Sequence, residues 1–75
     1  MRHSEFWQLM AAEFGEAYAR TLARELVISS LGERTALQAL GGHEDARTVW
    51  WAVCEAMDVP PERRWGQDQQ GRRVR

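Results

Sequence analysis

Glycines divide this chain of 75 residues into short segments, and the apolar residues of each segment recur at helical spacing. The dividing positions are Gly15, Gly32 and the Gly41–Gly42 doublet. Glycine favours a helix end because it adopts backbone conformations that other residues avoid. No stretch alternates between apolar and polar residues for long enough to indicate a strand. The pattern therefore predicts several short helices and no β-sheet.

The first two predicted helices meet at Gly15. Ser4 is the expected N-cap of the first helix. The apolar stripe comprises Phe6, Leu9, Met10, Phe14, Tyr18, Leu22 and Leu26, with Trp7 beside it. We expect two helices with a break near Gly15, and a single kinked helix over residues 5–28 is the alternative. The second helix is expected to fray around residues 28–30 and to stop by Gly32.

Two further helices are predicted in the second half of the chain. Thr35 and Gln38 form a capping box, in which each side chain bonds the backbone amide of the other residue, so a helix is expected over residues 36–40. Asp45 is the expected N-cap of the last helix, and Pro60 ends it. The apolar stripe of that helix comprises Val49, Trp50, Val53, Cys54 and Met57.

These elements predict an all-α fold, a compact bundle of about four short helices with a disordered C-terminal tail. Residues 1–66 form the single helical domain, in which residues 61–65 add one further turn. Residues 67–75 contain Gln, Asp, Gly and Arg with one Val, and are predicted to be a disordered arginine-rich tail. The tryptophans expected in the core are Trp7, Trp50 and Trp65.

Charge is distributed unevenly along the chain. Residues 1–62 carry five arginines and ten carboxylates, whereas residues 63–75 carry five arginines and one carboxylate. The arginines of this basic end are Arg63, Arg64, Arg72, Arg73 and Arg75. An acidic body is a poor platform for nucleic acid, because phosphate binding needs clustered cations. The basic end is interpreted first as a solvated tail, and weak contact with nucleic acid is the alternative.

No group of residues has the spacing of a catalytic or metal site. Cys54 lies on an apolar stripe, where burial raises the pKa of a thiol and makes it inert. Cys54, His3 and His43 are too few and too irregularly spaced to hold zinc. We therefore expect neither an enzyme nor a cofactor. One cysteine excludes an internal disulfide, and no apolar run approaches the about 20 residues of a membrane span, so a cytoplasmic protein is expected.

The segment from Val27 to Leu40 invites comparison with a helix-turn-helix, with Gly32 in the turn. The second helix would read DNA bases, yet it has no arginine and only Gln38 among base-reading side chains. Its two leucines are expected to serve the core. Specific duplex binding through this unit is therefore not expected.

Several ordered segments resemble a known family. They are Ser4–Trp7, Glu13–Arg20, Leu31–Ala36, Val49–Cys54 and Met57–Gly66. The series resembles the small actinobacterial family called domain of unknown function 3046. The resemblance implies an all-helical, cytoplasmic protein with no assigned activity. It also implies an association with recombination or DNA repair, since genes of the family often lie beside those for the strand-exchange recombinase and its regulator.

Trp51 departs from the family pattern, in which the position after Trp50 is often polar. If Trp50 faces the core, Trp51 points about 100° away, onto a face that also carries Arg47 and Glu55. An exposed tryptophan on a polar face is typical of a protein interface. The alternative is that Trp51 packs on Arg47, one turn earlier, or under Trp65 and the Pro60–Pro61 loop.

Two functional hypotheses follow. The leading hypothesis is a non-enzymatic interaction or regulatory module that binds another protein through Trp51, Arg47 and Glu55. The alternative is an accessory DNA-binding protein that acts through its arginine-rich C-terminal end. Binding to DNA measured over a range of salt concentrations separates them, because phosphate contacts weaken steeply as salt rises.

Overall fold

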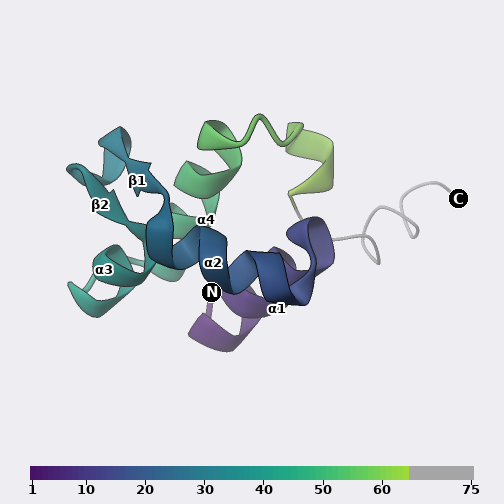
Figure 1. Ribbon diagram of the computed structural model, residues 1–75, viewed down its shortest axis with the longest axis horizontal. Coiled ribbons are helices and arrows are strands. Elements are labelled where there is room, and N and C mark those ends of the chain that lie inside the picture. The colour runs from purple at the N-terminus through teal and green to yellow at the C-terminus, as the bar shows by residue number, and fades with distance from the viewer. Residues whose placement is uncertain (65–75) are drawn as a thin grey trace, which may run out of the picture.

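A computed structural model describes residues 1–64 and contains four α-helices and a small two-stranded sheet (Figure 1). The helices are α1 (His3–Phe14), α2 (Glu16–Glu25), α3 (Ala36–Gly41) and α4 (Ala46–Ala56). Between α2 and α3 lie β1 (Val27–Ile28), the 3-10 helix η1 (Ser29–Leu31) and β2 (Arg34–Thr35). A second 3-10 helix, η2 (Pro61–Arg63), follows α4. The predicted bundle of four short helices is confirmed.

The break between α1 and α2 falls at Gly15, as predicted. Gly15 has φ +90° and ψ 146°, a conformation that is strained for residues with a Cβ atom. Two helices are therefore present rather than one kinked helix. The prediction of Ser4 as N-cap was wrong, because α1 begins at His3 and its N-cap is Arg2, two residues earlier. The Glu5 Oε1 atom accepts a hydrogen bond of 2.9 Å from the backbone N–H of Arg2, which satisfies a donor that precedes the helix.

The prediction that the chain contains no strands was wrong between α2 and α3. β1 and β2 pair in antiparallel register, Val27 with Thr35 and Ile28 with Arg34. The β-branched pair at residues 27–28 suits an extended strand, with the Ile28 side chain buried and the Val27 side chain exposed. Because this segment is extended, the helix-turn-helix considered for residues 27–40 is not formed.

The short helix α3 has the predicted capping box. Thr35 Oγ1 accepts from the Gln38 backbone N–H at 3.2 Å, and Gln38 Oε1 accepts from the Thr35 backbone N–H at 2.9 Å. This cap fixes where α3 begins and therefore which of its side chains face the core. The helix is so short that only one of its faces is buried. Its buried side chains are Ala36, Ala39 and Leu40. Leu37 points outward and is 41% exposed, so its predicted place in the core was wrong.

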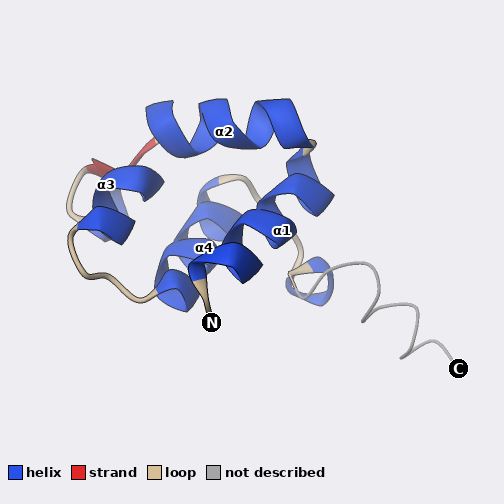
Figure 2. Cartoon of the chain, turned by 90° about the horizontal axis from the view of Figure 1, so that it is seen from below, coloured by secondary structure: helices blue, strands red, loops and turns tan. Residues whose placement is uncertain are grey.

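The core lies where α1 and α4 pack together and where α2 and α3 complete the enclosure (Figure 2). Trp50 is fully buried, as predicted, with the rings of Phe6 and Phe14 each 6.4 Å from it, centroid to centroid. One prediction for the apolar stripe was wrong. Tyr18 is 51% exposed, because α2 buries the face that carries Ala19, Leu22 and Ala23. Trp7, which was predicted in the core, is half-buried and packs against it. Trp65 lies outside the described residues.

Candidate functional site

Arg64 follows η2 directly and packs against α4. Its side chain is buried, and its Nε–H donates to the Val59 carbonyl at 2.9 Å. Its Nη1 atom bonds Glu55 Oε2 at 3.1 Å, and its guanidinium lies 4.6 Å from the ring centroid of Trp51. The Arg64 carbonyl accepts a 2.7 Å hydrogen bond from Trp50 Nε1. Arg64 therefore joins the end of the described chain to the core and to the surface of α4.

These contacts change the interpretation of Trp51 and Glu55. Trp51 is half-buried rather than freely exposed, and the Arg64 guanidinium lies over its ring. Glu55 binds Arg64, although its side chain remains 67% exposed. The structure does bring the predicted residues together, around a surface hollow of about 530 Å³ between α4 and η1. We call it the Trp51 hollow; its lining includes Arg47, Thr48, Trp51, Glu55 and Leu31. Its use as a protein interface stays a prediction.

The predicted basic end is divided by the structure. Arg63 is paired with Glu13 of α1 at 2.7 Å, and Arg64 is buried, so both side chains contact the folded domain rather than lie in a solvated tail. The remaining members, Arg72, Arg73 and Arg75, lie outside the described residues. Arg34, the cation nearest to α3, donates to the Leu31 carbonyl at 2.7 Å and to Glu44 at 3.0 Å.

Cys54 is buried on α4, as the apolar stripe predicted. Burial raises the pKa of its thiol to about 12, while the Arg64 guanidinium partly opposes that shift. A thiol with such a pKa is protonated and poorly nucleophilic at neutral pH. Within residues 1–64, no group of three or more His, Cys, Asp or Glu side chains is placed to hold a metal ion.

The raised pKa of Cys54 predicts a loss of stability at alkaline pH. The folded chain keeps the thiol proton up to about pH 12, whereas the unfolded chain releases it from pH 9.0 upward. Stability contributed by this group is thus complete below pH 9 and is lost as the pH rises through the folded pKa. Between pH 8 and pH 10, the free energy of unfolding should fall by about 1 kcal/mol more in the wild type than in Cys54→Ala. Urea unfolding at both pH values measures this difference, and equal losses would contradict it.

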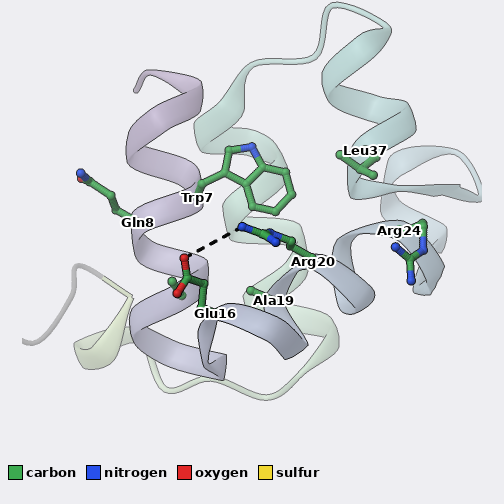
Figure 3. A pocket seen from close by; sticks show the side chains of 8 residues that line it. Trp7, Gln8, Glu16, Ala19, Arg20, Arg24 and Leu37 are labelled. Carbon is green, nitrogen blue, oxygen red and sulfur yellow. Dashed lines mark ion pairs between the residues drawn. The ribbon is translucent and has the colours of Figure 1, made fainter.

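A second hollow lies on another face of the molecule, between α1, α2 and α3. We call it the Trp7 groove; it encloses about 610 Å³ and is lined by Trp7, Gln8, Ala11, Glu16, Ala19, Arg20, Arg24 and Leu37. Figure 3 shows that Trp7 and Leu37 point toward the same space from different helices, with Arg20 beside them. The apolar part of the lining is therefore contributed by elements far apart in the sequence.

Small residues on facing helices create the Trp7 groove. Ala11 of α1 and Ala19 of α2 line it, and neither side chain is long enough to fill it. Trp7 is held in place by Phe6, whose buried ring meets the Trp7 ring edge-on with centroids 5.1 Å apart. Leu37 lines the groove because α3 buries Ala36, Ala39 and Leu40 on its other side. Two large apolar side chains thus border a hollow whose floor is made of alanine.

Arginines border the apolar part of the groove. Arg20 and Arg24 are one turn apart on α2, so their Cα atoms are separated by about 6 Å along the helix axis. Arg20 lies 4.0 Å from Glu16, and Arg24 lies 3.6 Å from Glu25. Both distances exceed those of a charge-assisted hydrogen bond, and all four side chains are more than half exposed. These ion pairs are therefore weak.

The sequence contained partial signals for this groove. Trp7 lies beside the apolar stripe rather than on it, and Arg20 and Arg24 share one face of α2. The missing information was the packing of α3. A six-residue helix has no periodicity long enough to show which of its leucines faces inward.

Comparison with known proteins places the chain in a family but gives it no activity. None of the helices within residues 1–64 combines the length and the apolar character needed to cross a membrane. Neither the curated proteins nor the solved structures used for comparison include a significant match. Residues 1–62 match the family described as "Protein of unknown function (DUF3046)". Because that match covers all four helices and most of the chain, the protein belongs to the DUF3046 family.

Proposed function

We propose that this protein is a non-enzymatic interaction module that binds another protein through the Trp7 groove. The observation that carries the proposal is the pairing of half-buried Trp7 with 41% exposed Leu37 across a hollow of about 610 Å³. Aromatic and aliphatic side chains at a concave surface are typical of binding sites, because a partner that covers them gains from removing apolar area from water. An association with recombination or DNA repair, as the family resemblance implies, is part of this proposal.

The groove supports this function better than the Trp51 hollow does. In the Trp51 hollow, the tryptophan already stacks with Arg64, which in turn binds Glu55. A partner would have to compete with contacts that hold the fold together. In the Trp7 groove, Leu37 is 41% exposed, so a partner could cover it without displacing the core. The Trp51 hollow remains the interface proposed from the sequence, and the experiment below compares the two.

A photo-crosslinking experiment tests the proposed function. A photoreactive phenylalanine analogue replaces Leu37 in one variant and Tyr18 in another, and each is irradiated in cells that express the protein natively. Both positions carry exposed, large apolar side chains, but only Leu37 lines the groove. We expect a discrete protein adduct from position 37, identified by mass spectrometry, and no such adduct from position 18.

Two further measurements complete this test. The partner, purified after identification, should lose binding to Leu37→Glu and keep binding to Tyr18→Glu. A third variant carries the same photoreactive analogue in place of Thr48, which lines the Trp51 hollow. It shows whether a partner binds that surface instead. Adducts from position 48 alone would move the interface to the Trp51 hollow. The same adducts from all three positions, or none, would contradict an interaction through the groove.

A further inference from the structure

The residues that line the Trp7 groove include more arginines than carboxylates, unlike the rest of residues 1–64. Two arginines and one glutamate line the groove. The rest of residues 1–64 carries five arginines and nine carboxylates. The lining of the groove thus has a net charge of +1 on a chain segment that is otherwise acidic, with Glu25, outside the lining, 3.6 Å from Arg24. A negatively charged ligand is favoured at the groove and repelled elsewhere.

The arginines at the groove also make longer carboxylate pairs than Arg34, Arg63 and Arg64 do. Arg34, Arg63 and Arg64 bond carboxylates at 3.0, 2.7 and 3.1 Å. The pairs made by Arg20 and Arg24 measure 4.0 and 3.6 Å. Among the carboxylate-paired arginines of residues 1–64, these two guanidiniums therefore keep the most hydrogen-bonding capacity for an incoming carboxylate. Arginine binds carboxylates through two parallel N–H donors, which gives such contacts strength and direction.

From these observations we infer that the Trp7 groove binds an acidic amphipathic peptide segment of the partner protein. One bulky apolar side chain of the segment packs against Trp7 and Leu37. Two carboxylates of the segment pair with Arg20 and Arg24, which lie one helical turn apart on α2. This inference rests on the proposed function and adds the chemistry of the partner. Extended nucleic acid is disfavoured, because the rest of residues 1–64 carries more carboxylates than arginines and would repel a polyanion.

The size of the groove agrees with this ligand. A hollow of about 610 Å³ lies within the range of sites that bury a small ligand. It accommodates one or two apolar side chains but no folded domain. The arginines lie on α2 alone, whereas the apolar residues come from α1 and α3, so the peptide is oriented with its carboxylates toward α2. Affinity then depends on both halves of the contact, apolar and charged.

A displayed library of random 16-residue peptides, selected against the immobilised full chain, tests the inference. We expect the enriched peptides to share a bulky apolar residue with Asp or Glu spaced two to four residues apart. Synthetic peptides from the selection should bind the wild type and Tyr18→Glu equally. Leu37→Glu should weaken binding at least about tenfold, since it places a charge in the apolar contact. Arg20→Gln combined with Arg24→Gln should weaken it by a similar factor.

A charge exchange makes the test independent of folding defects. Peptides in which both carboxylates are replaced by Lys should fail to bind the wild type. The same peptides should bind the Arg20→Glu, Arg24→Glu variant more tightly than the wild type, a gain that an unfolded variant cannot produce. Circular dichroism confirms that each variant is helical.

The outcomes distinguish a wrong peptide chemistry from a wrong binding surface. Peptides that depend on Leu37 but show no acidic preference and no response to the arginine changes would overturn the inferred chemistry and leave the groove as an interface. Peptides unaffected by Leu37→Glu, or no enrichment above background, would overturn both.

Discussion

Replacing Trp50 with alanine is expected to lower the free energy of unfolding by about 3–5 kcal/mol. Trp50 is fully buried between α1 and α4, and its ring meets Phe6 and Phe14 edge-on. Truncation leaves a large cavity and removes the donor that binds the Arg64 carbonyl at 2.7 Å. A domain of this size has little stability to spare, so most molecules should be unfolded at 37 °C. Thermal and urea unfolding followed by circular dichroism measure the effect.

Trp50→Phe is the matched control. It keeps an aromatic ring in the core but lacks the indole N–H, so the Arg64 carbonyl loses its buried partner. We expect an intermediate loss of about 1–3 kcal/mol, the cost of a smaller ring and an unpaired buried acceptor. If Trp50→Ala melted within a few degrees of the wild type, the packing of α1 against α4 described here would be incorrect.

Arg64→Ala is expected to lower the free energy of unfolding by about 2–3 kcal/mol. We expect no other alanine substitution of a charged residue within residues 1–64 to destabilise the fold as much. Arg64→Ala removes the hydrogen bond to the Val59 carbonyl, the contact with Glu55 and the stacking on Trp51. Each of these is worth about 1 kcal/mol when partly shielded from water. Arg63→Ala is the control. Arg63 is half exposed in its pair with Glu13, so its loss should cost no more than about 1 kcal/mol.

Two observations check this assignment. Arg64→Ala should raise the exposure of the tryptophans, seen as a red shift in their fluorescence under native conditions. A double-mutant cycle between Trp51→Leu and Arg64→Ala should give a positive coupling energy. Equal stabilities of Arg63→Ala and Arg64→Ala, with no coupling to Trp51, would show that Arg64 has no special role.

The helices were predictable because their signals are local. The break at Gly15, the capping box of Thr35 with Gln38 and the burial of Trp50 each depend on residues close together in the sequence. The strands were not predictable, because two residues are too few to show alternation. Their pairing depends on η1, which brings Val27 opposite Thr35.

The candidate site was less predictable than the fold, because it depends on contacts between distant residues. The sequence placed Trp51 on a surface with Arg47 and Glu55, and the structure groups them around one hollow. It could not show that Arg64, beyond a proline turn, returns to cover Trp51. Nor could it show the Trp7 groove, which forms only when α3 packs beside α1 and α2.

The contacts of Arg64 also decide where this domain ends for practical purposes. The match to the family model ends at residue 62, two residues before the side chain that binds Val59, Glu55 and Trp51. A fragment cloned to the family boundary would lose Arg63 and Arg64 and would leave the Trp50 indole N–H buried without its acceptor. This chain, trimmed at that position for expression, would therefore be less stable, although every residue matched by the family model would be intact. The smallest self-sufficient unit of this chain extends at least to Arg64.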